Sequence, residues 1–359
     1  MATRKLLFRC DASTGIGLGH LSRCLNLADA VSRQGGACWF LVRRLGMDFS
    51  SWIVERGHTI IEHDVEVDVE VDVASGEVTT CLSDADQTRT KAEAARLGVG
   101  WIVVDSYSAS SAYLAGLAGG NWRICVLDDL ADRDLRSADA IVNPTPGAQA
   151  WPYIVSPQSV LLAGPQYALI HPTFAKARDS TGPSRIRPTA QRIMVCLGGT
   201  DASNLTEAVV DALVDAEPEA EPEAEIRAVV GPRPAAESLR ARRPTVELLP
   251  RQSPAELASL MQWADLAVAT ASTVAFELSC LSVPSILIIA AANQARFVSA
   301  LIERKLIPVL DAEYLPTMLG QLSALVRSHA ERVARGDYTC WNELCDGKGA
   351  VRVASILLS

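Results

Sequence analysis

The chain has 359 residues, and its 42 Asp and Glu against 33 Lys and Arg give a formal net charge of -9 at pH 7. Hydrophobic residues make up 49% and charged residues 21%, a balance that favours folded domains over a disordered chain. The acidic excess disfavours a nucleic-acid partner, because phosphate binding requires surplus cations. At roughly 150 residues per domain, the length predicts about two domains.

Nine cysteines are scattered along the chain, and no two form a Cys-x-x-Cys pair. This pattern favours free thiols in a reducing compartment over a disulfide framework or a zinc site. The apolar run 6–8 is too short for the core of a signal peptide, and the longest run, 286–292, is too short to span a bilayer. We therefore predict a cytoplasmic protein with no membrane partner and no metal site.

Short apolar runs alternate with helical patterns from the N-terminus onward. Runs that are apolar throughout are typical of parallel strands covered on both faces, and in the first half we expect such strands at 6–9, 38–42, 102–105, 124–128, 140–143 and 160–163. Spacings of three and four predict a helix through Leu21, Leu25, Ala28 and Val31. The stretch 65–73, where valine alternates with acid, is either an edge strand or an acidic loop.

The segment 176–191 is rich in proline, serine and charge and lacks an apolar period, so the domain boundary is expected there. Beyond it the alternation returns, with strands expected at 193–197, 226–230, 246–248, 266–269, 285–289 and 308–310. Ser253, Pro254 and Glu256 have the spacing of a capped helix start. The repeated Glu-Pro-Glu-Ala of 216–225 predicts a solvent-exposed loop tip.

Alternation of strands and helices through both halves predicts an α/β protein with two doubly wound, Rossmann-like domains. We place the first domain at 1–178 and the second at 190–330, followed by a tail at 331–359. Ligands of open α/β sheets bind beyond the carboxyl ends of the strands. The predicted ligand site is therefore a cleft across which the two domains face each other.

A histidine follows three glycines at the first predicted strand-to-helix turn. The segment 15–19 reads Gly-Ile-Gly-Leu-Gly before His20, and its spacing does not fit the dinucleotide fingerprint Gly-x-Gly-x-x-Gly. Glycines such as Gly17 and Gly19 let a ligand approach the backbone at a helix start. His20 is either a polar residue at a helix end or a general base, a role that suits imidazole near neutral pH. Asp11 is the nearby carboxylate that would fix its tautomer.

The second half opens with a comparable turn. Its strand at 193–197 is followed by Gly198, Gly199 and Thr200 and then by a helical pattern. The two glycines permit a ligand to approach the backbone, and the polar residues beyond them can cap the helix. The pattern fits either a nucleotide contact or a simple turn and cap.

Small hydroxyl residues follow the expected strand at 266–269. Ser272 and Thr273 at a helix start suit a phosphate, which backbone N–H and hydroxyl groups bind without a metal. Glu277 stands one turn later on the same helix face, where it can accept hydrogen bonds from a ribose diol or simply face solvent. Asn293 and Gln294 stand after the next expected strand. The chain has no Gly-x-x-x-x-Gly-Lys-Ser/Thr motif, which excludes P-loop nucleotide hydrolysis.

Eight segments stand in a fixed order: 9–13 (Arg-Cys-Asp-Ala-Ser), 15–24 (through His20 to Arg23 and Cys24), 84–88 (Asp-Ala-Asp-Gln-Thr), 104–107 (Val-Asp-Ser-Tyr), 127–129 (Leu-Asp-Asp), 167–170 (Tyr-Ala-Leu-Ile), 198–201 (Gly-Gly-Thr-Asp) and 272–277. Together, over about residues 5–310, they resemble a family of nucleotide-sugar hydrolases of pseudaminic acid biosynthesis, the UDP-2,4-diacetamido-2,4,6-trideoxy-β-L-altropyranose hydrolases. The chain departs from the family at Ser106, where members have histidine, and this bears on the sugar recognised.

The resemblance implies a fold of the glycosyltransferase-B class, often with a C-terminal helix that returns to the first domain. It implies a UDP-sugar substrate, water as acceptor and no cofactor. His20 matches the general base, Asp11 a position near it, and Tyr107 a contact to sugar or water. Arg23 belongs to the histidine motif. The resemblance assigns the nucleotide to the glycine loop of the second half and to Ser272, Thr273 and Glu277, and it places Asn293, next to Gln294, near diphosphate or sugar.

The predicted function is therefore inverting hydrolysis at the anomeric carbon of a UDP-linked amino or deoxy sugar, which releases UDP and the free sugar. The first alternative is an inverting glycosyltransferase that uses the same base with a carbohydrate acceptor. The second is a nucleotide-sugar binding protein without catalysis.

Overall fold

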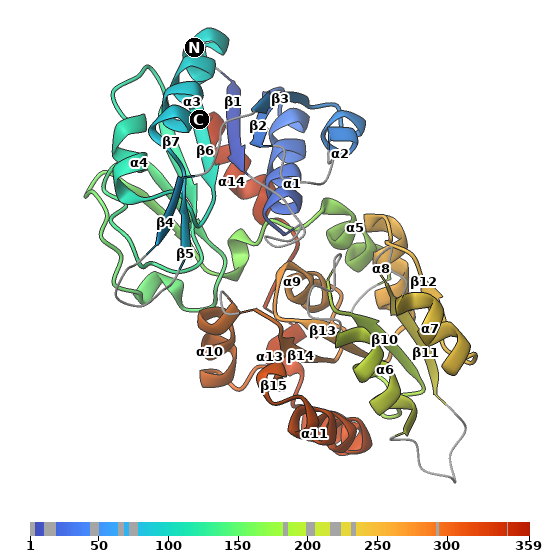
Figure 1. Cartoon of the computed structure of the whole chain (residues 1–359). Helices are drawn as coiled ribbons and strands as arrows, with labels where there is room; N and C mark the ends of the chain where they lie inside the picture. Colours follow the sequence, from blue (N-terminus) through green and yellow to red (C-terminus); the bar gives the residue numbers. More distant parts are fainter. Residues whose placement is uncertain are drawn as a thin grey trace. The chain divides into compact units, whose positions relative to one another are not determined.

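The computed structural model describes residues 4–10, 19–43, 50–63, 68–71, 78–181, 186–198, 205–215, 224–230, 235–291, 294–342 and 344–359. The chain forms two compact units, the first of Met1–Leu169 with Gly349–Ser359 and the second of Ile170–Lys348. Each unit is built on its own parallel sheet with helices on both faces (Figure 1). This confirms the predicted α/β class with two Rossmann-like units.

The sheet of the first unit has the order β3-β2-β1-β6-β7-β8-β9 within the described residues. Its strands are β1 (Lys5–Cys10), β2 (Ala37–Arg43), β3 (Thr59–His63), β6 (Trp101–Asp105), β7 (Arg123–Leu127), β8 (Ala140–Asn143) and β9 (Val160–Ala163). Every residue of β6 and β8 is buried, as expected for strands covered on both faces. The chain runs outward from β1 to β3 and resumes at β6 on the other side of β1. The strand order therefore reverses between β1 and β6, the place where doubly wound folds bind ligands.

Helices cover both faces of this sheet. They are α1 (Gly19–Arg33), α2 (Ser50–Glu55), α3 (Asp84–Leu97), α4 (Ser111–Leu117) and α14 (Gly349–Leu358), with short 3-10 turns at Ala148–Ala150 and Pro165–Tyr167. Alternate side chains of β1 enter different cores, because successive strand residues point to opposite faces. Leu6 and Phe8 pack in the core with α1 and α14, whereas Leu7 packs in the core with α3 and α4.

Two shorter strands lie within and after the acidic stretch. β4 (Asp68–Val71) pairs antiparallel with β5 (Val78–Cys81). Part of the stretch 65–73 is therefore a strand, in line with the first of the two predicted alternatives. Residues 64–67 and 72–77 lie outside the described residues.

The sheet of the second unit has the order β12-β11-β10-β13-β14-β15 within the described residues. Its strands are β10 (Arg192–Cys196), β11 (Glu225–Val229), β12 (Glu247–Leu249), β13 (Leu266–Thr270), β14 (Ser285–Ile289) and β15 (Val309–Asp311). The order reverses between β10 and β13. The turns that follow β10, β13 and β14 therefore share one edge of this sheet.

The described helices of the second unit are α5 (Pro172–Thr181), α6 (Leu205–Asp215), α7 (Ala235–Arg242), α8 (Pro254–Trp263), α9 (Thr273–Cys280), α10 (Ala295–Glu303), α11 (Leu315–Arg327), α12 (His329–Arg335) and α13 (Thr339–Asn342), with a 3-10 turn at Ala312–Tyr314. The predicted cap of α8 is present. Ser253 accepts from the backbone N–H of Glu256 at 3.3 Å, and the Glu256 carboxylate accepts from the backbone N–H of Ser253 at 2.8 Å.

The division between the units differs from the predicted boundary. The chain enters the second unit after Leu169 and returns to the first after Lys348. The polar segment 176–191 begins inside α5 and continues beyond its end, and α5 packs on α8 and α9 of the second unit. The polar composition therefore starts within this helix, whereas the packing divides the chain before the helix begins. Of the predicted tail 331–359, only the last helix, α14, belongs to the first unit.

Helix α14 packs along α1 in the first unit (Figure 1). Its buried residues Ala350, Val353, Ala354 and Leu357 recur at helical spacing and form one apolar stripe. The helix begins at Gly349, where a Cβ atom would lie only 2.3 Å from the carbonyl oxygen of Ala168. Glycine at this position permits the close backbone approach.

Candidate functional site

A cluster of charged side chains occupies the carboxyl edge of the first sheet, where the strand order reverses. His20 is the second residue of α1, which follows β1, and Asp105 is the last residue of β6. Asp129 stands two residues beyond the end of β7. Because β1, β6 and β7 are neighbouring parallel strands, their carboxyl ends bring these three side chains together.

The imidazole of His20 is held by Asp105. His20 Nδ1 lies 2.5 Å from Asp105 Oδ1, and both residues are buried. An ionised carboxylate accepts a hydrogen bond, so Nδ1 carries the proton and Nε2 has the free lone pair. Among the described residues, no hydrogen bond engages Nε2. This is the arrangement of a general base whose tautomer is fixed by a carboxylate.

Arg23 lies one helical turn after His20 and joins the two carboxylates. Its Nε and Nη2 donate to Asp105 at 2.7 and 2.6 Å, and its Nη1 donates to both oxygens of Asp129 at 2.8 Å. Burial lowers the pKa of Arg23, but the charges of Asp105 and Asp129 outweigh it and hold that pKa well above its ordinary value. The guanidinium is therefore a permanent cation in this cluster.

The same contacts fix the charge of Asp105. Burial alone raises the pKa of this carboxyl, but the charges of Arg23 and His20 oppose burial and hold the pKa well below its ordinary range. Asp105 is therefore ionised at neutral pH. The thiol of Cys24 also donates to Asp105 Oδ2, at 3.4 Å.

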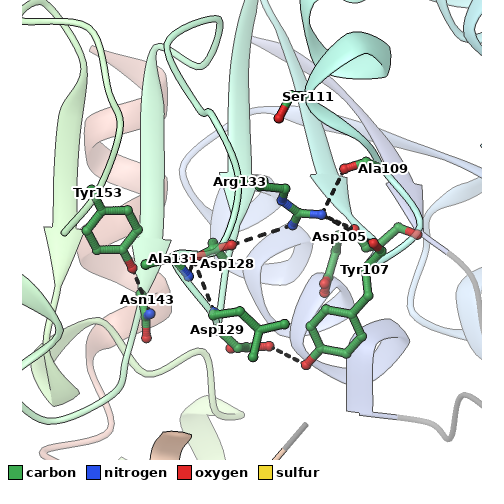
Figure 2. A network of polar contacts seen from close by, with 12 residues as sticks. Asp105, Tyr107, Ala109, Ser111, Asp128, Asp129, Ala131, Arg133, Asn143 and Tyr153 are labelled. Carbon is green, nitrogen blue, oxygen red and sulfur yellow. Dashed lines mark hydrogen bonds and ion pairs between the residues drawn. The ribbon is translucent and has the colours of Figure 1, made fainter. Parts of the chain in front are cut away.

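Tyr107 completes the cluster from the loop after β6 (Figure 2). Its hydroxyl donates to Asp129 Oδ2 at 2.7 Å, and its ring stands edge-on to the ring of His20, with centroids 4.7 Å apart. Desolvation, followed by the charge of Asp129, raises the pKa of Tyr107 well above its ordinary value, so the hydroxyl stays protonated. Ser106 accepts from the backbone N–H of Ser108 at 3.2 Å and so stabilises its own loop.

In the second unit, Gly198 lies at the turn after β10. Its φ angle of +96° is in the region that favours glycine, and no atom of the described residues lies within 4 Å of where a Cβ would be. The turn therefore requires glycine for its backbone conformation, and the described residues leave the space beside it open.

Helix α9 begins at the turn after β13. Ser272 is the N-cap residue, but its side chain makes no capping bond and instead lies 3.1 Å from the hydroxyl of Thr270. Thr273 is the first residue of the helix. The Ser272 and Thr273 hydroxyls thus stand at a helix N-terminus, where the backbone N–H groups and the dipole favour an anion.

Glu277 lies one turn into α9 and is buried. No described side chain forms a hydrogen bond or ion pair with its carboxyl group. Burial, and then the charge of Cys280, raise the pKa of Glu277 from 4.5 to about 8. Buried carboxyl groups with raised pKa values cluster at functional sites, which makes Glu277 a candidate site residue. Gln294, at the cap of α10, accepts from the backbone N–H of Ala290 at 2.9 Å.

The structure brings together some of the predicted residues within each unit. His20, Arg23 and Tyr107 share the first cluster, with Gly19 at the start of the same helix. Gly198, Ser272, Thr273, Glu277 and Gln294 follow three neighbouring strands of the second unit. Asp11, Gly17, Gly199, Thr200 and Asn293 lie outside the described residues.

Sequence reasoning did not assign a role to two carboxylates of the first cluster, Asp105 and Asp129. The sequence named Asp11 as the local candidate for the tautomer-fixing carboxylate; Asp11 lies outside the described residues, and within them the carboxylate in contact with His20 is Asp105. Asp129 was part of the segment 127–129 but had no predicted role. The available signal was an acidic residue at the carboxyl end of an apolar strand, directly for Asp105 and two residues beyond the strand for Asp129.

The described residues contain neither a metal-binding cluster nor a membrane-spanning helix. No group of three or more His, Cys, Asp or Glu side chains is placed to hold a metal ion there. Within the same residues, no helix is long and apolar enough to cross a membrane.

Comparison with known proteins gives a distant homologue and many structural neighbours. No family model matches the chain. The spore coat polysaccharide biosynthesis protein SpsG of Bacillus subtilis (strain 168) is 24% identical over 244 residues, which cover 66% of this chain and 69% of SpsG.

Solved structures match almost the whole length. MurG of Acinetobacter baumannii has a TM-score of 0.62 at 15% identity and covers 98% of this chain and 99% of its own. The spinosyn forosaminyltransferase SpnP has a TM-score of 0.60 at 15% identity, with 99% of both chains covered. MnaA of S. aureus, solved with UDP, has a TM-score of 0.60 at 10% identity and covers 97% of this chain and 94% of its own. The chain therefore has the two-domain α/β fold of the glycosyltransferase-B class.

Proposed function

We propose that this protein is an enzyme that transfers a glycosyl group from a nucleotide-sugar donor to a hydroxyl acceptor, with inversion at the anomeric carbon. The observation that carries the proposal is the His20 imidazole, whose Nδ1 is held by Asp105 and whose Nε2 has no partner among the described residues. The distant homologue acts in polysaccharide biosynthesis, and neighbours of the same fold include a glycosyltransferase and a protein solved with UDP.

In the proposed reaction, His20 Nε2 accepts the proton of the acceptor hydroxyl as its oxygen attacks the anomeric carbon. The bond from that carbon to the phosphate oxygen breaks, and its electron pair leaves with the nucleoside diphosphate. The proton remains on Nε2, and the imidazolium that forms is balanced by the ionised carboxylate of Asp105. General-base assistance of this kind contributes about 10²–10⁴-fold in rate.

Arg23 serves the base indirectly. Arg23 Nη2 and His20 Nδ1 share the same oxygen, Asp105 Oδ1, at 2.6 and 2.5 Å. The guanidinium keeps the carboxylate ionised and fixes the side from which it contacts the imidazole. We therefore assign Arg23 and Asp105 as positioning residues and Tyr107 as a sugar or acceptor contact.

The nucleotide is assigned to the second unit. Helix N-termini stabilise phosphate through free N–H groups and the helix dipole, which supports Ser272 and Thr273 as diphosphate contacts. The open turn at Gly198 supports a close backbone approach, and with it a role for Gly199 and Thr200. Glu277 is proposed to accept hydrogen bonds from the ribose hydroxyls. Asn293 and Gln294 are proposed for the sugar and diphosphate.

Water is the second candidate acceptor. It is favoured by the eight ordered segments that resemble the nucleotide-sugar hydrolases, including the loop before His20 and the turn at Gly198. With water, the same base and leaving group give a free sugar. The chemistry at the donor is unchanged, so the two candidates differ only in the molecule that delivers the oxygen.

The test is release of nucleoside diphosphate from a panel of UDP- and dTDP-linked sugars, with and without carbohydrate acceptors, and with the anomeric configuration of the product read by NMR. If the enzyme is a transferase, the rate of nucleoside diphosphate release is expected to rise at least tenfold when a suitable acceptor is added. The product is then expected to be a glycoside with inverted anomeric configuration. Release at the same rate without acceptor, with free sugar as product, favours hydrolysis. A chain that binds UDP in calorimetry but turns over no donor is the non-catalytic binding protein.

A further inference from the structure

The loop that follows β7 is joined to the loop that follows β6 by one arginine (Figure 2). Arg133 Nη1 donates to the backbone carbonyls of Ser106 at 3.1 Å, Tyr107 at 3.4 Å and Ala109 at 2.8 Å. All three acceptors belong to the loop 106–109. The Arg133 side chain is only 13% exposed, so these bonds replace hydration that the guanidinium has lost.

Asp128 shapes the loop that presents Arg133. Its Oδ2 accepts from the backbone N–H groups of Leu130 at 3.2 Å and Ala131 at 2.7 Å, and its Oδ1 lies 3.5 Å from Arg133 Nη2. Ala131 has a φ angle of +49°, a conformation unfavourable for alanine that the surrounding bonds must hold. The turn is therefore pre-formed, and Arg133 leaves it in a fixed direction.

The loop that Arg133 holds carries a side chain of the candidate site. The Tyr107 ring stands edge-on to His20, and its hydroxyl donates to Asp129 in the loop after β7. Among the described contacts, Arg133 joins the two loops through backbone carbonyls, and Tyr107 joins them through Asp129. Any loosening of the first link changes where the Tyr107 ring lies against the imidazole.

We propose that Arg133 is a positioning residue, which holds the loop 106–109 so that Tyr107 stays against His20. In its kinetic consequences the proposal rests on the proposed function, because it acts on the proposed general base. In its structural consequence, the contact between the two rings, it stands independently of any reaction.

The same loop supplies a matched control. Arg136 lies three residues after Arg133 and pairs with Asp134, and its side chain is 68% exposed. It donates to no residue of the loop 106–109 in the described structure. Arg136→Met therefore makes the same substitution as Arg133→Met, but it leaves the hydrogen bonds from Arg133 to the loop 106–109 in place.

The first experiment is kinetic. Arg133→Met is expected to lower kcat by about 10- to 100-fold, the scale of a misplacement of roughly 1 Å, while the UDP Kd stays within twofold. Arg136→Met is expected to keep wild-type kcat. If Arg133 acts through the tyrosine ring, Arg133→Met lowers kcat much less in a Tyr107→Leu background, which lacks the ring, than in the wild type. Full additivity of the two substitutions overturns the proposal.

The second experiment needs no activity. In protein labelled with ¹³C-histidine, the His20 ring signal is assigned by its loss in His20→Gln. The edge-on aromatic ring shifts that signal, so it is expected to move in Tyr107→Leu, to move in the same direction in Arg133→Met, and to stay in place in Arg136→Met. A His20 signal that remains at the wild-type position in folded Arg133→Met overturns the proposal.

The proposal stays testable if Arg133→Met does not fold or if the wild type shows no turnover. Should Arg133→Met fail to fold, Arg133→Lys is used. Lysine keeps the positive charge but lacks the planar, multidentate guanidinium group, so the His20 signal is expected to move less than in a variant that loses the charge as well. A His20 signal that does not move in Arg133→Lys overturns the proposal. Should the wild type turn over no donor, the proposed function fails and the NMR measurement alone decides the role of Arg133.

Discussion

His20 and Arg23 converge on a single carboxylate, and this sharing is the main feature of the candidate site at the residue scale. A buried carboxylate that serves two donors must remain ionised, and the depressed pKa of Asp105 meets that condition. The carboxylate then fixes the imidazole tautomer, and the guanidinium offsets the cost of burying the charge. The arrangement thus separates the imidazole, which we propose to move the proton, from the two charged groups that hold the imidazole in place.

Replacing the shared carboxylate tests this separation. Asp105→Asn keeps the size of the side chain but removes the charge and permits the wrong imidazole tautomer, so kcat is expected to fall by about 10²–10⁴-fold. The UDP Kd, measured by calorimetry, is expected to stay within twofold. Asp134→Asn, at a half-buried carboxylate of the same unit, is the control and is expected to retain wild-type kcat. A folded Asp105→Asn protein with wild-type kcat contradicts the assigned role.

Glu277 predicts a pH dependence of stability. Burial raises its pKa from 4.5 to about 8 in the folded chain, so between these values the folded state holds a proton that the unfolded state has lost. The stability contributed by this group is therefore complete below about pH 4.5 and declines as pH rises through about 8. One pKa unit corresponds to about 1.4 kcal/mol. The unfolding free energy of Glu277→Gln is therefore expected to exceed that of the wild type by roughly 1 kcal/mol at pH 5. The difference is expected to rise to roughly 4 kcal/mol by pH 9.

The measurement is urea unfolding at pH 5, 7 and 9. Glu303→Gln, at an exposed site on α10, serves as the control and should differ from the wild type by at most about 0.5 kcal/mol at each pH. A stability difference between Glu277→Gln and the wild type that does not change with pH contradicts the raised pKa.

Apolar patterning predicts the strands better than it predicts their contacts. The ranges 140–143, 160–163 and 285–289 match β8, β9 and β14 to the residue, because buried parallel strands are apolar throughout. Strand β3 was not predicted, since Thr59–His63 has only two consecutive apolar residues at the sheet edge. The contact of His20 with Asp105 depends on the register that pairs Cys10 with Asp105 across β1 and β6, information that no local pattern carries.

Helix α14 offers a direct test at the element scale. Leu357 is 2% exposed in the core with α1, whereas Val351 on the same helix is 44% exposed. Leu357→Ala leaves a cavity and is expected to cost about 2–5 kcal/mol of unfolding free energy. Val351→Ala is expected to change it by at most about 0.5 kcal/mol. Equal losses for the two variants, measured by urea unfolding, contradict the packing of α14 on the first unit.

Across the whole molecule, the two units repeat one plan. In each sheet the strand order reverses beside the first strand, and the polar residues of interest stand at the turns nearest that reversal. The sequence indicated this plan, because each half opens with a strand, a glycine-bearing turn and a helix. It could not separate transfer from hydrolysis, since both reactions need the same base and the same leaving group.

We propose that His20 is the base that activates the acceptor. The most direct measurement compares wild type and His20→Gln for turnover of a UDP-sugar found active in the donor panel, together with the UDP Kd of each protein. If His20 is the base, kcat is lower by about 10²–10⁴-fold in His20→Gln, and the UDP Kd stays within twofold of the wild type. Turnover by folded His20→Gln at the wild-type rate would show that His20 is not the base.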